Sequence, residues 1–363
     1  MKNTGINLEK VRIRNRASVL SCIRSKGEVS RKEIAELTGL TPASVTQICG
    51  DLLEEGLLKE AGIDDTAKGA GRRKIMLKID PAFGTILSVN IEAEKTVISL
   101  DDLNGDPVGG QAAIRRLSTE PKSDPLRFLD KVAEVCKELT RWLKEPPLGV
   151  SVGVVGQVDR ERGVSTHAYG IWDSEVPVAA FLEKRLGIPC LVENNVNAFA
   201  LAELTFGAGR SHDDLLIVKW GPGVGCALII RGALYDGRRG RAGELGHVIV
   251  EPGGKPCPCG RRGCLETRIS SRALAGLDFV PDDALNLFAR TLVNTITVCA
   301  PNKVLLYGPF FKDTALKDRF LRACLAMDGT LDGERILETE LADRVEHIGP
   351  TAVFLRRRIF GME

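Results

Sequence analysis

Residues 243–266, "GELGHVIVEPGGKPCPCGRRGCLE", form the most specific pattern in this 363-residue chain. One histidine, His247, precedes three cysteines, and the glycines and prolines between them permit a tight loop. Three thiolates and one imidazole complete a tetrahedral zinc site and leave no position for a catalytic water. The pattern therefore predicts a structural Zn²⁺ ion held by His247, Cys257, Cys259 and Cys264. Three free cysteines in a turn-rich loop are the alternative.

Segments on both sides of this loop alternate between strand and helix patterns. Residues 84–108 and 215–234 each have the pattern of two strands joined by a turn. Residues 148–159 are typical of a buried strand that runs into a glycine loop, and residues 127–144 have the apolar periodicity of a helix. Strand pairs that alternate with helices in both halves predict an α/β body of two similar lobes.

The first eighty residues have a different pattern. Ser30, with Glu33 three positions later, is typical of a capping box that begins a helix, and Gly39 is typical of a helix end. Thr41 followed by Pro42 then begins a second helix. Two short helices joined by a glycine-containing turn indicate a helix-turn-helix, whose second helix enters the major groove of DNA through its N-terminal residues.

The segment at residues 57–80 completes this DNA-binding unit. It predicts a β-hairpin with a basic, glycine-rich tip, a wing that reaches phosphates or the minor groove. The predicted DNA contacts are polar residues at the start of the second helix and basic residues of the wing: Thr41, Ser44, Thr46, Gln47, Arg72, Arg73 and Lys74. A three-helix module that binds protein instead of DNA is the alternative.

Composition and charge agree with this division. The chain is 44% hydrophobic and 27% charged, which is ordinary for a soluble globular protein. Residues 1–32 contain nine basic and two acidic residues, although the net charge of the whole chain is only +2, so a polyanionic partner is expected at this end. The longest apolar runs are too short to span a bilayer, and the N-terminus lacks the apolar core of a secretory signal. We therefore expect a cytoplasmic protein without membrane insertion.

These motifs together resemble the ROK family, which groups bacterial repressors, open reading frames and sugar kinases. Within it, the chain is similar to the winged-helix regulators of glucose, xylose and N-acetylglucosamine use, most strongly over residues 193–264. The resemblance implies a winged helix-turn-helix over residues 1–80 and a two-lobed, actin-like (ribonuclease H-like) sugar-kinase-type body. Its lobes would cover residues 83–195 and 196–363. The second lobe would hold the zinc loop and the dimerisation surface, and its last helix would pack back on the first lobe.

The resemblance also implies a sugar pocket. A pyranose presents hydroxyls that both donate and accept hydrogen bonds, and an unpaired buried hydroxyl costs about 1–3 kcal/mol, so such a pocket needs carboxylates and amides. The residues that match the family's sugar contacts are Gly156, Gln157, Asn194, Asn195, Glu244, His247 and Glu266. Ordinary solvated acids at Glu244 and Glu266 are the alternative.

Three departures from the kinases of this family argue against phosphotransfer. Asn195 replaces the aspartate base of the motif E-N-D-x-N-A, and an amide does not accept a proton near neutral pH. Residues 90–94, "NIEAE", replace the phosphate loop D-x-G-G-T and place carboxylates where a triphosphate would lie. Pro222 replaces the hydroxyl residue of the second phosphate loop, "GPGVG" at residues 221–225. The resemblance therefore implies a protein that is not an enzyme.

The resulting prediction is a sugar-responsive transcriptional regulator, most simply a repressor of carbohydrate uptake or catabolism genes. It would bind double-stranded operator DNA as a homodimer or tetramer, and a sugar or sugar-phosphate effector in the degenerate kinase cleft. Two alternatives stay open. One is an active ATP-dependent sugar kinase with an appended DNA-binding domain, and the other is a repressor controlled by a transporter subunit.

Overall fold

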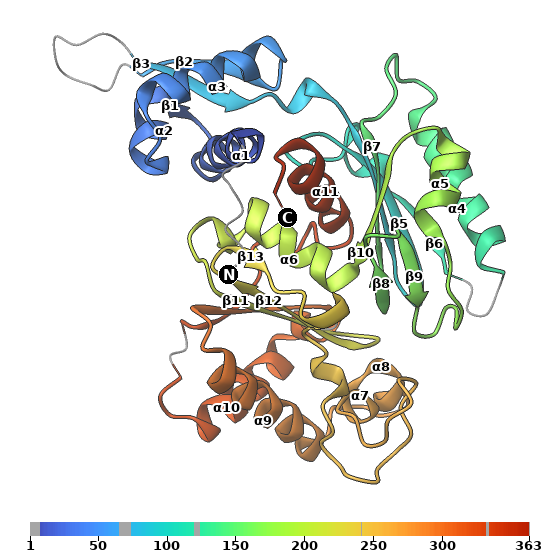
Figure 1. The fold of residues 1–363 in the computed structure, drawn as a ribbon. Helices are drawn as coiled ribbons and strands as arrows, with labels where there is room; N and C mark the ends of the chain where they lie inside the picture. The colour runs from blue at the N-terminus through green and yellow to red at the C-terminus, as the bar shows by residue number, and fades with distance from the viewer. Residues whose placement is uncertain (1–7, 65–73, 120–123, 241, 332–333, 363) are drawn as a thin grey trace.

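The computed structural model describes residues 8–64, 74–119, 124–240, 242–331 and 334–362. Figure 1 shows an N-terminal head, coloured blue, that lies against a body with two larger sheets. Among the described residues, no helix combines the length and the apolar character that a membrane crossing requires.

The head is a winged helix-turn-helix. Ser30 and Glu33 form both bonds of the expected capping box, and Gly39 ends the helix in the left-handed conformation with φ of 69°. The Thr41 hydroxyl accepts from the Ser44 N–H at 3.2 Å and caps the next helix. The elements of the head are α1 (Leu8–Lys26), β1 (Val29–Ser30), α2 (Arg31–Thr38), α3 (Pro42–Glu54), β2 (Leu58–Asp64) and β3 (Lys74–Ile79). The sheet order is β1-β3-β2, with antiparallel pairing throughout.

The first body sheet has the order β10-β7-β4-β5-β6. Strands β4, β7 and β10 run parallel, while β5 and β6 complete it in antiparallel pairing. Helices α4 and α5 flank this sheet (Figure 1), and α4 ends at Thr140, four residues earlier than the sequence pattern predicted. The elements are β4 (Ile86–Ile91), β5 (Lys95–Asp101), β6 (Arg115–Ser118), α4 (Pro125–Thr140), β7 (Gly149–Val154), β8 (Gln157–Asp159), β9 (Val164–His167), α5 (Val178–Leu186) and β10 (Cys190–Asn194).

The second body sheet repeats the same arrangement. Its order, β15-β14-β11-β12-β13, has the same parallel and antiparallel pairing as the first sheet, so β4 corresponds to β11 and β5 to β12. The prediction of two similar lobes is therefore confirmed. The remaining elements are α6 (Asn195–Phe206), β11 (Leu215–Trp220), β12 (Val224–Ile230), β13 (Ala233–Leu234), α7 (Glu266–Ile269), α8 (Ser271–Leu274), α9 (Asp282–Cys299), β14 (Lys303–Tyr307), α10 (Thr314–Met327), β15 (Ile336–Glu338) and α11 (Ile348–Phe354).

Two helices connect the parts of the molecule. Helix α6 packs against α11, and α11 packs in turn against β4 and β7 of the first sheet (Figure 1). After α11 the chain forms a π-helical turn, η7 (Leu355–Ile359). Phe354, Leu355 and Phe360 share one apolar cluster with the core of the head, which includes Leu20 and Ile23. The head is therefore packed onto the end of the chain and not merely tethered to the body.

Candidate metal centre and sugar site

The four predicted zinc ligands lie together. Their ligand atoms are all within 4.8 Å of one another. The Nδ1 atom of His247 is 3.5 Å from Sγ of Cys257, and Sγ of Cys259 is 3.7 Å from Sγ of Cys264. A tetrahedron with Zn–S of about 2.3 Å and Zn–N of about 2.05 Å has N–S and S–S edges of about 3.6 and 3.8 Å. The spacing of these side chains therefore fits a tetrahedral ion of the size of zinc.

The backbone of the loop holds this arrangement. His247 ends the 3₁₀ turn η5 (Leu245–His247), and bridge pairs join Ile249 to Cys264 and Pro256 to Arg262. Gly263 adopts φ of 74°, and a side chain there would lie 1.7 Å from the carbonyl oxygen of Glu251. Only glycine permits this crossing, which brings Cys264 back beside the start of the loop.

The pKa shifts of His247 and Cys259 favour metal binding, whereas burial raises the pKa of the other two thiols, Cys257 and Cys264. Burial lowers the pKa of His247 to about 4, so its ring is neutral at pH 7 and keeps a lone pair. Its Nε2 atom lies 3.6 Å from Oε2 of Glu244, and this carboxylate orients the ring so that Nδ1 faces the thiols. Burial alone would raise the pKa of Cys259, but hydrogen bonds from the Arg261 backbone and the neighbouring thiols lower it. The cluster could hold a metal ion.

Asn194 joins the first sheet to α6. Its Oδ1 accepts from the N–H groups of Val196 and Asn197 at 2.8 and 3.1 Å, which makes it the N-cap of the helix. Its Nδ2 donates to the Gly156 carbonyl at 2.7 Å. A carboxamide has two N–H donors, and the second has no hydrogen-bond partner among the described residues. Asn194 therefore has one donor left for a ligand, while its oxygen is already used.

Tyr169 contacts two of the predicted sugar-binding residues, Gln157 and His247, although the sequence analysis did not single it out. Its hydroxyl accepts from Nε2 of Gln157 at 3.0 Å, and its ring centroid lies 5.3 Å from that of His247. Burial raises the pKa of Tyr169 to about 12, so the hydroxyl stays protonated near neutral pH. Tyr169 belongs to no motif, and only the folded position of the loop after β9 identifies it.

Glu244 and Glu266 are the two acidic residues near His247 and Tyr169. The Glu266 carboxylate accepts from the Val224 N–H at 3.4 Å, beside the glycine turn between β11 and β12. Burial and, after it, the charge of Glu244 raise the pKa of Glu266. The structure therefore brings the predicted residues from four separate segments, around Gly156, Asn194, Glu244 and Glu266, to neighbouring positions in the body.

Asn195 has a partner that the sequence analysis did not foresee. Its Nδ2 donates to Oε1 of Glu92 at 3.1 Å, and Nζ of Lys219 lies 2.5 Å from both oxygens of the same carboxylate. Asn195 and Lys219 are 7% and 8% exposed. Burial alone would raise the pKa of Glu92, but the Lys219 ammonium outweighs it and lowers the pKa, so the Glu92 carboxyl is ionised near neutral pH.

Four of the seven predicted DNA contacts lie at the start of α3. Thr41, Thr46 and Gln47 are exposed at the start of α3, and Ser44 is half-buried. Lys74 is the first residue of β3 and lies opposite Asp64, at the end of the hairpin away from its base, and its Nζ pairs with Glu33 of the capping box at 3.3 Å. The other two wing residues, Arg72 and Arg73, lie outside the described residues.

Comparison with known proteins places these features in one family. Residues 86–278 match the pattern described as the ROK family, and residues 14–59 match that of a winged helix-turn-helix DNA-binding domain. The chain belongs to the ROK family. It is 32% identical over 268 residues to the DNA-binding transcriptional dual regulator NagC of Escherichia coli and 30% identical over 260 residues to the xylose repressor of Caldicellulosiruptor bescii. These alignments cover 74% and 72% of this chain, but only 65% and 64% of the two relatives, less than two thirds of their length.

Solved structures show that the ROK fold extends through the chain. A ROK family transcriptional regulator, a homologue of the E. coli MLC protein, has a TM-score of 0.76 at 22% identity and covers 97% of this chain and 98% of its own. A ROK family glucokinase from Streptomyces griseus, solved with glucose and AMPPNP, has a TM-score of 0.62 at 24% identity. It covers 74% of this chain and 99% of its own. The winged head and the ROK sugar-kinase-like body that the sequence predicted are thus confirmed as the fold.

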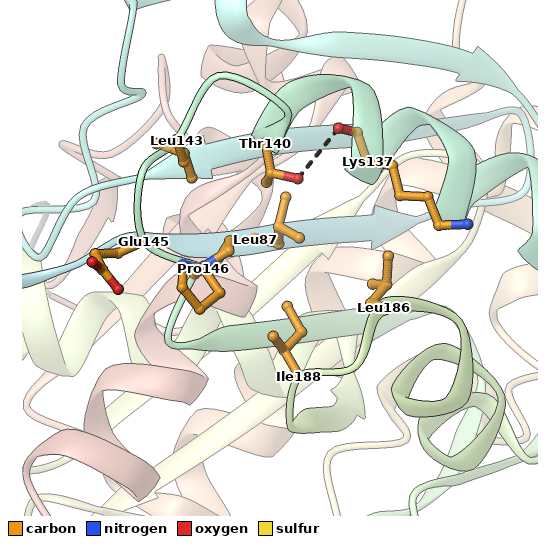
Figure 2. A pocket seen from close by; sticks show the side chains of 9 residues that line it. Leu87, Lys137, Thr140, Leu143, Glu145, Pro146, Leu186 and Ile188 are labelled. Carbon is orange, nitrogen blue, oxygen red and sulfur yellow. Dashed lines mark hydrogen bonds between the residues drawn. The ribbon is translucent and has the colours of Figure 1, made fainter.

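A crevice of about 160 Å³ in the first lobe is separate from this site (Figure 2). It is lined by Leu87 near the start of β4, by Lys137 and Thr140 at the end of α4, and by Ile188 just before β10. Asn194 lies at the other end of β10, and β4 and β10 both pair in parallel with β7. The crevice is therefore at the amino ends of these strands, whereas the predicted sugar contacts are at the carboxyl ends.

Proposed function

We propose that this ROK-family chain is a sugar-responsive transcriptional regulator that represses genes of carbohydrate uptake or catabolism. Its ligand would be a sugar bound around Asn194, Glu244, His247 and Glu266. The observation that supports this function is the direct packing of the winged head against α6, the helix that begins at Asn195 beside this site. Relatives named NagC and xylose repressor agree with the proposal.

Helix α6 gives the first physical connection. It begins at Asn195, is capped by Asn194, and ends at Phe206. There Arg24 of α1 lies over the Phe206 ring, with 5.2 Å between the guanidinium carbon and the ring centroid. A ligand that moves the N-terminus of α6 would therefore move a residue in contact with the head. Such a ligand changes DNA affinity only if it binds the two arrangements with different affinity.

The C-terminal turn gives the second connection. Arg357 of η7 bonds to Glu193, the residue before the Asn194 cap, and Asn197 of α6 also donates to Glu193 at 3.3 Å. Three residues later, Phe360 packs in the core of the head and lies 5.8 Å from the guanidinium carbon of Arg24. π-Helical turns are rare in proteins overall, but those that occur are frequently found at functional sites. The π-helical turn η7 therefore agrees with a transmitting role for this segment.

The remaining partners follow from this function. We propose that the head, residues 1–80, binds double-stranded operator DNA, and that residues 83–195 and 196–363 are the lobes that respond to the sugar. A homodimer or tetramer would match a pseudo-palindromic operator with two heads. We also propose that the metal is Zn²⁺ and that it is structural, because four protein ligands leave no open position, and that the chain has no kinase activity.

Operator binding tests the function. In fluorescence anisotropy with the promoter region of its own gene, the full chain should bind with an affinity that falls steeply as salt rises, because phosphate contacts release counterions. Gln47→Ala should weaken binding by about fivefold or more if Gln47 contacts a base. Gln111→Ala, at an exposed glutamine on the body, is the matched control and should change nothing. A sugar from a panel of hexoses, pentoses and N-acetylhexosamines should change the operator affinity. Salt-independent or absent binding to the promoter contradicts the proposal.

A further inference from the structure

The two lobes meet at an ion pair near the corresponding ends of β4 and β11. Glu92 directly follows β4, at the turn into β5, and Lys219 is the second-last residue of β11, just before the corresponding turn into β12. The Glu92 carboxylate accepts from Lys219 with both oxygens and from Asn195 with one. The side chains of Lys219 and Glu92 are only 10% and 22% exposed. The Glu92 carboxylate therefore fills the position between the lobes where an anion could bind Lys219 and Asn195. We call this the anion position, and it lies next to Asn194 of the sugar site.

This pair leaves little positive charge for an anionic ligand. Lys219 is neutralised by Glu92, and Arg357 is bonded to Glu193. Arg272 acts electrostatically on Glu266, which is itself close to the charge of Glu244. A phosphate monoester carries about −1.5 to −2 charge at pH 7 and needs charged or N–H donors. It would reach the Lys219 ammonium only by displacing Glu92, which would then be partly buried beside a second anion.

We propose that Glu92 is a specificity-determining residue that fills the anion position beside Asn195, so that the site accepts uncharged sugars and rejects their phosphates. This inference rests on the proposed function, because it names the class of effector for the same site. It also gives Glu92 and Asn195, which both depart from the kinase pattern, a shared role. Asn195 donates to Glu92, whereas a carboxylate at position 195 would repel it.

The experiment compares matched ligands on the full chain. Isothermal titration and thermal shift would use glucose and glucose 6-phosphate, N-acetylglucosamine and its 6-phosphate, and inorganic phosphate at constant ionic strength. For the wild type, any sugar that binds should lose at least tenfold in affinity when it is phosphorylated, and inorganic phosphate should give no thermal shift. In Glu92→Gln, Lys219 loses its counter-charge, so the phosphorylated sugar should gain at least tenfold while the neutral sugar stays within threefold. Inorganic phosphate should now stabilise this variant.

Two controls separate the charge of Glu92 from general effects. Glu94→Gln removes the same charge two residues away at an exposed position and should keep the wild-type preference. The double variant Glu92→Gln/Lys219→Met removes both charges and should lose any phosphate response. It is also the less disruptive change if the unpaired Lys219 of the single variant unfolds the protein. If no sugar binds, the proposed function fails, but the inorganic phosphate arm still tests Glu92. Equal binding of a sugar and its phosphate by the wild type, or a phosphate response that Glu92→Gln does not change, overturns the inference.

Discussion

At position 195 a carboxamide suits its surroundings better than a carboxylate would. The Asn195 amide donates to Glu92 at 3.1 Å, in a group where Asn195 and Lys219 are buried and Glu92 is half-buried. An aspartate there would place two carboxylates at hydrogen-bond distance with only Lys219 to neutralise them. The asparagine that the resemblance to the kinases matches to their catalytic base is thus a hydrogen-bond donor to Glu92 in this chain.

Asn195→Asp tests this directly. The variant restores the carboxylate of the kinase motif, but Glu92 still fills the anion position, so we expect no ADP release with any hexose in a coupled assay, for wild type and variant alike. Repulsion from Glu92 should also lower the thermal unfolding midpoint, by about 2–4 °C for each kcal/mol lost. Turnover above background in either protein would mean that the chain is a working kinase.

Replacement of one proposed zinc ligand tests the metal site. Cys264→Ser should reduce bound zinc, measured by mass spectrometry of the purified chain, from about one ion per chain to well below one. It should lower the unfolding midpoint by roughly 5 °C or more, because the ion binds only the folded loop. Cys299→Ser, at an exposed cysteine outside the cluster, should change neither quantity. Full zinc content in Cys264→Ser would exclude the proposed ligand set.

Among the elements, α6 is the one that connects the predicted sugar contacts to the head. Asn194 caps its first turn. The ring of its last residue, Phe206, lies against two guanidinium groups, and its centroid is 5.2 Å from the guanidinium carbon of Arg24 and 5.3 Å from that of Arg344. Burial lowers the pKa of Arg24 to about 10, which still leaves it charged at pH 7. A straight twelve-residue helix therefore joins the predicted sugar contacts to the first helix of the head.

Phe206→Leu should weaken this connection. Leucine keeps the apolar contact but removes the cation–π attraction, which contributes about 0.5–2 kcal/mol when desolvated. We expect unchanged sugar affinity, with a two- to fivefold smaller effect of sugar on operator affinity, measured by anisotropy with and without sugar. The matched control is Phe181→Leu, which removes a similar pair with Arg185 on α5, away from the head. Equal coupling in the wild type and Phe206→Leu would exclude a role for this contact.

The whole molecule is held together by contacts between its parts. Lys219 and Glu92 join the two lobes, while Lys95 and Arg116 of the first lobe both pair with Glu346, just before α11. The head adds its own contact through Phe360. Head, first lobe and C-terminal helix share packed surfaces, through which a shift between the lobes would act on the head. The proposed regulator requires this coupling, which a flexible linker would not provide.

The sequence by itself determined the features that depend on near neighbours. The capping box of Ser30 and Glu33, the turn at Gly39 and the hairpin of the wing were predictable because their hydrogen bonds join residues a few positions apart. The clustering of His247 with the three cysteines was predictable because three closely spaced thiols and a nearby imidazole are typical of a tetrahedral zinc site.

Only the tertiary structure decided which distant residues meet. Lys219 and Glu92 are 127 positions apart, and nothing in either segment indicates the other. Their contact exists because two equivalent sheets face each other at corresponding turns. Tyr169 beside His247 and Arg24 against Phe206 were missed for the same reason. Local patterns specify helices, turns and metal ligands, whereas the partners of a buried charge or ring depend on how the completed elements pack.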